Sequence, residues 1–339
     1  MTSILSKHID LKQTSPNTYG VSWDAEYVVG KALLGGYVAA QIHHVTATHL
    51  ITDPELVACN QPDILNLHLE FLRPSEPCMS TVTVTTLKLG AALSTIQLQL
   101  VQNGKIRVIA MATSANFDNS LGPTTPTMTK KAVGLSLHPP PGPKPDFDRV
   151  WAHQPDQNWI PGSLVGEITP VTSRILALYP RTGFTVDGIC DIWNSFLGDE
   201  RIDAAYLALM ADIIPSMSDT LLGNDGLYNA HAFWQEMKTW AETNPGVPAT
   251  MTNTVEEAMK SATFNVTVTM DLEFKRRLPR DGQRWIFVRT AADMLQDGRM
   301  GVGITICNEE MALLCAARQL IVVLDAKRRF AEKEAKPSL

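Results

Sequence analysis

The chain has 339 residues, 45% of them hydrophobic, which is enough apolar material for two ordinary domains with cores of their own. Its 29 basic and 35 acidic residues give a net charge of −6, and no block of Lys and Arg could neutralise a row of phosphates, so nucleic acid is not an expected partner. The five cysteines are widely spaced and odd in number, which excludes a disulfide framework or a CxxC metal site and indicates a reducing compartment.

The N-terminal segment predicts no targeting signal. Charged residues interrupt residues 1–12, where a signal peptide needs an unbroken apolar stretch, and no run reaches the ~18 apolar residues of a membrane span. We therefore expect a cytoplasmic protein with no membrane span. The final residues, Pro337, Ser338 and Leu339, share only the last Leu with the Ser-Lys-Leu peroxisomal signal, so a peroxisomal location is less expected.

The first part of the chain predicts one helix followed by antiparallel strands. Gly35 and Gly36 precede a segment, residues 37–50, in which Ala, Ile and Val recur every three or four residues, as in a helix packed on a sheet. The alternation of apolar and polar residues then predicts strands, and Asn103-Gly104 predicts a hairpin turn between the last two. The expected strands are residues 64–71, 81–87, 95–101 and 106–115.

A proline-rich linker divides the chain. Seven of the 21 prolines fall between Pro123 and Pro145, in a segment without apolar periodicity. We predict an N-terminal unit over residues 15–118, a linker over 119–148 and a C-terminal unit over 149–328, each unit of ordinary domain size.

The second part predicts the same order of elements with an insert. A helix is expected over residues 202–213, with Pro215 just beyond its end. The clearest strand is residues 263–274, in which twelve residues alternate strictly between polar and apolar, so that one face lies in a core and the other faces water or a cleft. Further strands are expected over residues 285–291, 300–307 and 311–324.

The two parts resemble each other in sequence. Residues 68–71, His-Leu-Glu-Phe, match residues 271–274, Asp-Leu-Glu-Phe, at an offset of 203 positions. Residues 102–105 and 307–310, which precede apolar runs, match at an offset of 205. Because order and spacing are both kept, an internal duplication is favoured over chance similarity between hairpin strands.

A helical insert, at about residues 216–260, lengthens the second part. Its aromatic and Met side chains, Phe233, Trp234, Met237 and Trp240, recur at spacings that place them on one helical face. A small helix that buries these residues against the sheet is slightly favoured over a lid or pocket wall.

Several common catalytic patterns are absent from the sequence. It contains no GxSxG elbow, Walker loop or HExxH motif, and the GxG at residues 301–303 runs into a strand where a dinucleotide loop would need a helix. His43, His44 and His49 lack the i,i+4 spacing of two metal ligands on one helical face. We expect neither a metal nor a cofactor.

Three polar residues in apolar surroundings are candidates for chemistry. Asp212 follows a strongly apolar helical stretch, where a carboxylate is costly to bury unless it is satisfied; the alternative is an exposed helix end. Thr267 lies on the polar side of the long strand, where β-propensity alone explains most threonines. Gln319 interrupts an apolar strand and needs a partner or a cleft.

The order of these segments resembles that of the double-hotdog acyl-CoA thioesterases of the thioesterase II type. The resemblance spans about residues 19–324 and rests on four segments: residues 34–40 (LGGYVAA), 67–74 (LHLEFLRP), 207–212 (LALMAD) and 317–319 (ARQ). It implies an α+β fold of two fused hotdog units, each a long helix wrapped by an antiparallel sheet.

The resemblance also implies a site and a reaction. By position, Asp212, Thr267 and Gln319 match the family's catalytic groups, which hold and activate a water against the thioester carbonyl without a covalent intermediate. A backbone N–H near Gly36, or a side-chain amide, would stabilise the oxyanion. Four further residues are expected to bind substrate: Gly36, Tyr37, His68 and Trp234. The expected partner is the thioester of acyl-CoA or of an acyl-carrier protein.

Two alternatives keep the fold but change the activity. One is a biosynthetic enzyme that cyclises, isomerises or dehydrates a polyketide-like intermediate, with His68 as the strand histidine near the presumed cleft. The other is a non-catalytic acyl-binding module. A homo-oligomer is left open, because two fused hotdogs already supply the pairing that single units obtain by dimerising.

Overall fold

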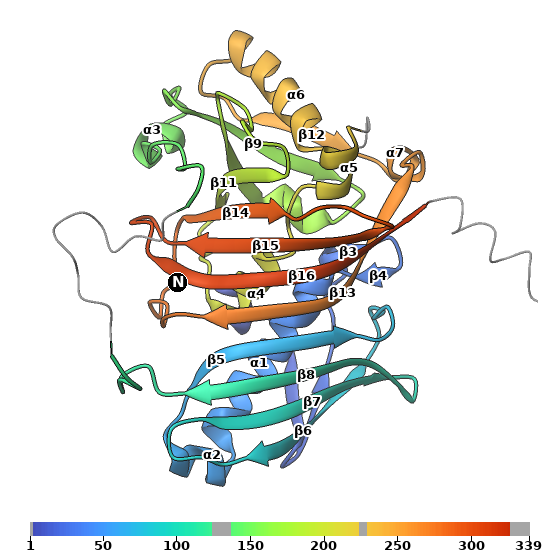
Figure 1. Cartoon of the computed structure of the whole chain (residues 1–339), viewed down its shortest axis with the longest axis vertical. Helices are drawn as coiled ribbons and strands as arrows, with labels where there is room; N and C mark the ends of the chain where they lie inside the picture. The colour runs from blue at the N-terminus through green and yellow to red at the C-terminus, as the bar shows by residue number, and fades with distance from the viewer. Residues whose placement is uncertain (1–2, 124–136, 224–228, 326–339) are drawn as a thin grey trace, which may run out of the picture.

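Two units share one continuous sheet in the computed structural model, which describes residues 3–123, 137–223 and 229–325. Within that part of the chain, 14 strands form the sheet in the order β1-β2-β6-β7-β8-β5-β13-β16-β15-β14-β11-β10-β9-β12. Neighbouring strands are antiparallel, except that β12 runs parallel to β9. Figure 1 shows the first unit below and the second above, with the sheet in front of the helices.

The first unit contains six strands of the large sheet, a short hairpin and two α-helices. Its strands are β1 (Leu11–Ser15), β2 (Thr18–Val21), β3 (Val28–Val29), β4 (Ala32–Leu33), β5 (Asp63–Phe71), β6 (Ser80–Lys88), β7 (Ser94–Gln102) and β8 (Lys105–Ala115). Its helices are α1 (Gly35–Thr52) and α2 (Pro54–Cys59), with 3-10 turns at η1 (Leu5–Lys7) and η2 (Ala25–Tyr27).

The second unit contributes eight strands and five α-helices in its described residues. Its strands are β9 (Trp159–Gly166), β10 (Ile175–Pro180), β11 (Ile189–Phe196), β12 (Ala249–Asn253), β13 (Thr263–Phe274), β14 (Ile286–Ala292), β15 (Arg299–Cys307) and β16 (Leu313–Asp325). Its helices are α3 (Phe147–Trp151), α4 (Ala204–Met210), α5 (Met217–Leu222), α6 (Ala230–Thr243) and α7 (Val255–Met259), with a 3-10 turn at η3 (Pro170–Arg174).

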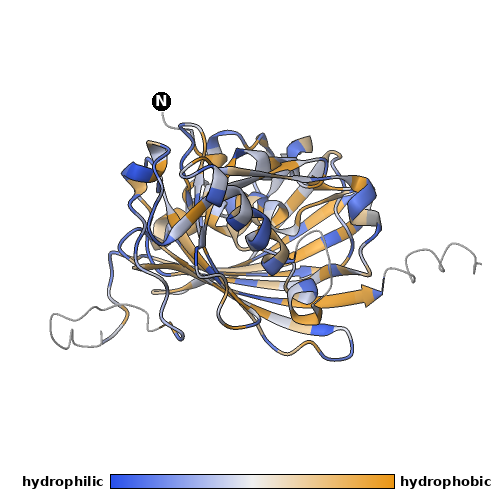
Figure 2. Cartoon of the chain, turned by 90° about the horizontal axis from the view of Figure 1, so that it is seen from above, coloured by the Kyte–Doolittle hydropathy of each residue, from blue (hydrophilic) through white to orange (hydrophobic). Residues whose placement is uncertain are grey.

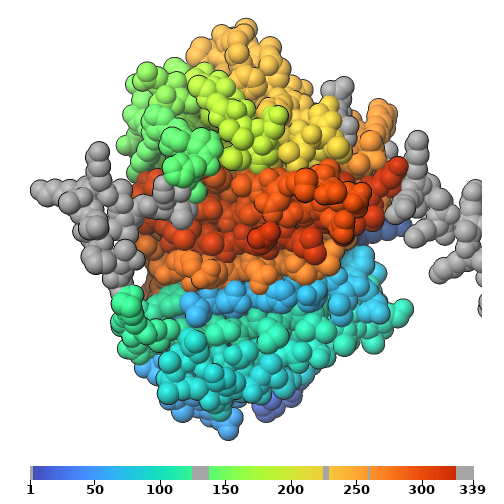
Figure 3. Space-filling view, in the orientation of Figure 1, coloured from blue at the N-terminus to red at the C-terminus, as the bar shows by residue number. Residues whose placement is uncertain are grey.

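The strand order repeats between the units. The order β1-β2-β6-β7-β8-β5 reappears as β10-β11-β14-β15-β16-β13, with α1 and α4 at the same point of each series. β5 and β13 join the units, and His68 lies directly opposite Asp271, the residue 203 positions later in the sequence. A pseudo-twofold axis therefore passes between these two residues. Figure 3 shows the junction as the boundary between the light-blue β5 and the orange β13.

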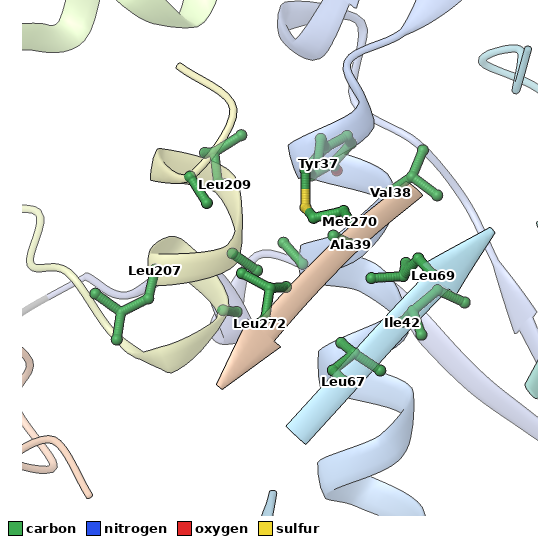
Figure 4. Close-up of a cluster of buried hydrophobic side chains, with 14 of the residues drawn as sticks. Tyr37, Val38, Ala39, Ile42, Leu67, Leu69, Leu207, Leu209, Met270 and Leu272 are labelled. Atoms are coloured by element: carbon green, nitrogen blue, oxygen red, sulfur yellow. The ribbon is translucent and has the colours of Figure 1, made fainter. Parts of the chain in front are cut away.

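The main core lies between the sheet and helices α1 and α4. Leu67 and Leu69 of β5 and Leu272 of β13 are fully buried and point towards these helices (Figure 4). α1 presents small residues such as Ala39, which let it lie close to α4 and to the sheet. Figure 2 shows the helices on one side of the sheet and alternating apolar and polar residues along its strands. The double-hotdog α+β fold expected from the sequence is confirmed.

The insert forms more than one element. It contains α5, α6, β12 and α7, and β12 extends the edge of the sheet beside β9. On α6, Phe233 and Met237 are buried as expected, Trp234 is partly exposed, and Trp240 is 43% exposed. The aromatic face is therefore only partly buried, and residues 224–228 of the insert lie outside the described part.

The linker joins β8 to α3. Residues 124–136 of it, like the C-terminal residues 326–339 with Pro337, Ser338 and Leu339, lie outside the described residues. The unit boundaries at 118 and 149 stay a prediction. Among the described residues, no helix is long and apolar enough to cross a membrane.

Candidate active site

Asp212 lies in the turn that follows α4. The sequence predicts a helix to residue 213, but α4 ends at Met210, and the Asp212 N–H donates to the carbonyl of Leu209 at 3.0 Å. The early end turns the carboxylate towards the first turn of α1. There the Gly36 N–H donates to Oδ2 of Asp212 at 2.7 Å. Asp212 is therefore partly exposed and hydrogen-bonded to α1. The alternative interpretation of the sequence, an exposed aspartate at a helix end, does not hold.

Gly36 is needed for this close approach of the two helices. A Cβ at position 36 would lie 2.6 Å from Cβ of Asp212 and 2.7 Å from the carbonyl oxygen of Leu209. Distances this short are not tolerated between carbon and backbone atoms, so only glycine fits here. Gly36 is expected from the sequence to bind substrate; in the structure its N–H binds Asp212.

Gln319 connects Asp212 to the sheet. It is 1% exposed on the inner face of β16, and its Nε2 donates to Oδ1 of Asp212 at 3.1 Å and to the carbonyl of Ala211 at 2.8 Å. Its Oε1 accepts from Oγ1 of Thr267 at 3.2 Å. All hydrogen-bonding atoms of the amide therefore have partners, which fixes its orientation.

Thr267 reaches this network because of a β-bulge. The pairing of β13 with β16 shifts between Thr267, which faces Ile321, and Thr269, which faces Leu320. The strict alternation expected over residues 263–274 is therefore wrong at this point, because the extra residue exchanges the two faces of the strand. Thr267 faces the helices, whereas Val266 is 39% exposed.

The environment of Asp212 favours its protonated form. Burial raises the pKa of the Asp212 carboxyl above its ordinary value, and the hydrogen bonds from Gly36 and Gln319 offset this only in part. A raised pKa makes the ionised carboxylate a stronger base than an exposed aspartate. Each of its oxygens accepts one of these hydrogen bonds, which leaves lone pairs for a proton from another group.

A narrow space separates the Asp212 carboxylate from Phe71. A methyl group at Gly35 would lie 3.2 Å from Oδ2 of Asp212 and 3.6 Å from Cζ of Phe71. Gly35, Phe71 and Asp212 are all partly exposed. The missing side chain of Gly35 therefore leaves a gap no larger than a methyl group, bounded by the Asp212 carboxylate on one side and the Phe71 ring on the other. Gly35 and Phe71 are not among the residues predicted from the sequence, although both lie in the segments that carry the resemblance.

The pseudo-equivalent position in the first unit lacks this polar set. In the repeated strand and helix order, His43 of α1 corresponds to Asp212. Ile64 corresponds to Thr267, and Ala112 corresponds to Gln319. The His43 ring lies 5.0 Å from that of Phe274, and burial lowers its pKa to about 3, so it is neutral.

The structure does not bring His68 to this site. His68 lies on the outer face of the sheet, because its neighbours Leu67 and Leu69 face the helices. There its Nδ1 lies 2.8 Å from Asp271, and its Nε2 lies 3.3 Å from Glu70. The expectation that His68 lies near the cleft is wrong, since period-two alternation places it on the face opposite to Gln319 and Thr267.

Tyr37 and Trp234 have other described contacts. Tyr37 is buried and stacks on Tyr27 with ring centroids 3.9 Å apart, so it supports the first turn of α1 next to Gly36. Trp234 donates from Nε1 to the carbonyl of Pro180 at 2.9 Å and anchors α6 to the end of β10. These contacts are structural and do not reach the Asp212 network.

Comparison with known proteins identifies the family. The model of the acyl-CoA thioesterase C-terminal domain matches residues 139–323, and that of the acyl-CoA thioesterase N-terminal domain matches residues 23–115. A thioesterase-like protein, TwmA, from Talaromyces wortmannii is 22% identical over 349 residues, which cover 98% of this chain and 95% of that protein.

Solved structures show the same fold. A hotdog-fold protein of unknown function from Alicyclobacillus acidocaldarius superposes with a TM-score of 0.65 at 15% identity, over 93% of this chain and 96% of that one. An acyl-CoA thioesterase II, TesB2, from Mycobacterium marinum gives a TM-score of 0.54 at 18% identity, over 93% and 95% of the two chains. With both halves matched in order by the two domain models, the chain belongs to the acyl-CoA thioesterase family.

Proposed function

We propose that this protein hydrolyses an acyl thioester, of CoA or of an acyl-carrier protein, to the free acid and the thiol. The observation that carries the proposal is the hydrogen-bonded network of Thr267, Gln319, Asp212 and Gly36, which holds the Asp212 carboxylate, a partly exposed group of raised pKa. Membership in the acyl-CoA thioesterase family supports the same reaction class.

In the proposed mechanism, Asp212 acts as general base towards a water in the gap beside Gly35. The ionised carboxylate takes a proton from the water as its oxygen attacks the thioester carbonyl carbon. Thr267 donates its hydroxyl hydrogen to Gln319, so its oxygen has lone pairs with which to accept a hydrogen bond from the same water. The tetrahedral intermediate then expels the thiolate, and Asp212 returns the proton to it.

The oxyanion needs a donor that is not already used. The Gly36 N–H and both hydrogens of the Gln319 amide are bound to Asp212 and Ala211. In the described part of the chain, the Gly35 N–H has no acceptor, and it belongs to the first turn of α1, where orphan amides favour negative charge. We assign the oxyanion to this amide, which would contribute on the order of 3 kcal/mol.

The alternatives lose support from the geometry. A hydratase-like or cyclising reaction that depends on His68 has that residue on the far face of the sheet. A non-catalytic module would have no need of Thr267, Gln319 and Asp212 to bind one another in largely apolar surroundings, an arrangement that is costly to keep.

Thiol release from a panel of acyl-CoAs tests the proposal. The panel includes short, medium, long and aromatic acyl groups, together with one acyl-carrier protein, and free thiol is detected continuously at neutral pH. We expect turnover of at least one class. A pure, folded protein that leaves every thioester intact would contradict the proposed function.

A further inference from the structure

The insert of the second unit begins against the strand that carries Thr267. Ser216 caps α5, and Ser218 follows in the first turn of that helix. The Ser218 hydroxyl donates to Oδ1 of Asn265 on β13 at 2.9 Å, and Nδ2 of Asn265 donates to Oγ of Ser216 at 3.4 Å. The two serine hydroxyls lie 3.2 Å apart. Because Ser218 gives its hydrogen to Asn265, Ser216 donates to Ser218, and the three side chains close a hydrogen-bonded ring.

This hydrogen-bonded ring fixes α5 on the sheet. Ser218 is fully buried and Asn265 is exposed, so the ring lies at the edge of the core. The oxygen and the nitrogen of the Asn265 amide each have a partner, which fixes the orientation of the amide, and hydrogen bonds in such closed networks strengthen one another. A further bond, from Oγ1 of Thr263 to Oδ1 of Asp219 at 3.3 Å, joins the same two elements.

The first half of β13 depends on these contacts for its position. β5 pairs with residues 269–273 of β13, so in the described part of the chain residues 263–268 have β16 as their one strand neighbour. The β-bulge between Thr267 and Thr269 interrupts the pairing with β16 as well. The side-chain bonds to α5 therefore supply a second restraint on the half of the strand that carries Thr267.

The ring connects the two residues between which the proposed reaction places its water. Asp212 precedes Ser216 by four residues along the chain. Asn265 precedes Thr267 by two residues, so the two side chains lie on the same face of β13. On the other side, Gln319 binds both Asp212 and Thr267. The separation between the Asp212 carboxylate and the Thr267 hydroxyl is therefore restrained by Gln319 on one side and by the ring on the other.

We infer that Asn265 is a positioning residue of the proposed hydrolysis, which with Ser216 and Ser218 fixes the place of Thr267 relative to Asp212. The inference rests on the proposed function and adds to it a role for the insert, which supplies both serines. Asn265 acts through Thr267 and Asp212 and needs no contact with the substrate. Its loss should therefore slow the reaction of bound substrate and leave substrate binding unchanged.

Steady-state thiol release by Asn265→Ala tests this role. A misplacement of about 1 Å can cost ~100-fold in rate, and Gln319 still restrains the site, so kcat should fall about tenfold while KM stays within about twofold of wild type. Asn66→Ala is the matched control. Asn66 is also a strand asparagine, and its Nδ2 donates to the Leu272 carbonyl at 3.3 Å, but it pairs with β13 six residues beyond Thr267. Its kcat and KM should equal those of wild type.

Ser218→Ala opens the same ring from the side of α5. Because the ring acts as a unit, the double variant Asn265→Ala/Ser218→Ala should have nearly the kcat of the slower single variant. Reductions of kcat that multiply in the double variant would overturn the inference. So would folded single variants that unfold at a lower urea concentration but keep the wild-type kcat, since the ring would then stabilise the fold without positioning the site.

Urea unfolding separates this inference from the proposed function, because it needs no turnover. In the described part of the structure no hydrogen bond joins Asn265 directly to Asp212, yet the ring holds the segment that follows Asp212. We therefore expect the midpoint shifts of Asn265→Ala and Asp212→Asn to be non-additive in the double variant, and additive shifts would overturn the inference. A protein that shows this coupling yet hydrolyses no thioester would contradict the proposed function only. Acyl-CoA hydrolysis with the full kcat in Asn265→Ala would overturn the inference and leave the proposed function standing.

Discussion

Substitution of Gly36 by alanine tests the contact on which the geometry of the site depends. The new Cβ would lie 2.6 Å from Cβ of Asp212 and 2.7 Å from the Leu209 carbonyl oxygen, so the two helices must separate by several tenths of an ångström. Overpacking of this kind costs about 1–3 kcal/mol, and the gain from alanine in a helix returns at most about 1 kcal/mol. The shift also moves the carboxylate away from the Gly36 N–H, and a misplacement of about 1 Å can cost ~100-fold in rate.

Gly35→Ala is the matched comparison for this prediction. Its Cβ meets only side-chain atoms, at 3.2 Å from Asp212 and 3.6 Å from Phe71, so the free energy of unfolding should change by less than about 0.5 kcal/mol. It should nevertheless lower kcat/KM, because the methyl group would occupy the place proposed for the attacking water. Urea unfolding and thiol release measure the two effects. A Gly36→Ala protein with wild-type stability and kcat would refute the reasoning.

Three further predictions concern the same network. Gln319→Leu should lower the free energy of unfolding by about 1–3 kcal/mol and reduce kcat, because the Ala211 carbonyl and Asp212 lose a buried donor; urea unfolding and steady-state kinetics check this. Thr267→Val should reduce kcat about tenfold, whereas Thr269→Val, on the outer face beyond the bulge, should not; equal kcat values for the two variants would contradict the placement of Thr267. Because burial raises the pKa of Asp212, kcat/KM should fall on acidification at a pH above the usual aspartate pKa of about 3.9, and a pH–rate profile tests this. The raised pKa also means that the folded protein holds this proton more tightly than the unfolded chain. The free energy of unfolding should therefore decrease as the pH rises through the raised pKa, which urea unfolding at several pH values tests.

Much of the architecture could be predicted from periodicity. The alternation at residues 64–71, 95–101 and 300–307 gives strands within one residue of β5, β7 and β15. The sequence offset of 203 between the halves predicts the duplication, and His68 and Asp271 face each other in the structure. These features depend on local patterns that tertiary contacts reinforce.

Other features could not be predicted because they depend on contacts between distant segments. Strands β9, β10 and β11 precede the second helix and carry little alternation, since they are largely buried on both faces; on β10, Leu178 is buried in one apolar cluster and its neighbour Tyr179 in another. A β-bulge leaves no reliable mark in a sequence, so the residues that Thr267 faces could not be known. The face of His68 was the opposite of the one assumed, because alternation gives two faces without saying which one the helices cover.

In the candidate site, too, some residues could be predicted from the local sequence and others could not. Asp212 and Gln319 stood out because each interrupts apolar sequence, and the structure joins them at 3.1 Å. Gly35 could not be selected from the sequence, because a missing side chain leaves no pattern. Its importance follows from what lies beside it, the Asp212 carboxylate and the Phe71 ring.

The central claim is that Asp212 is the general base of a thioester hydrolase, and comparison of Asp212→Asn with Asp203→Asn tests it most directly. Asp203 is also a largely buried aspartate of raised pKa, but it caps the opposite end of α4, where it accepts from the Tyr206 N–H at 2.8 Å. Steady-state thiol release should give a kcat reduced by about 10²–10⁴-fold in Asp212→Asn, and within about twofold of wild type in Asp203→Asn. An Asp212→Asn protein that is folded and retains more than about a tenth of the wild-type kcat would contradict the account.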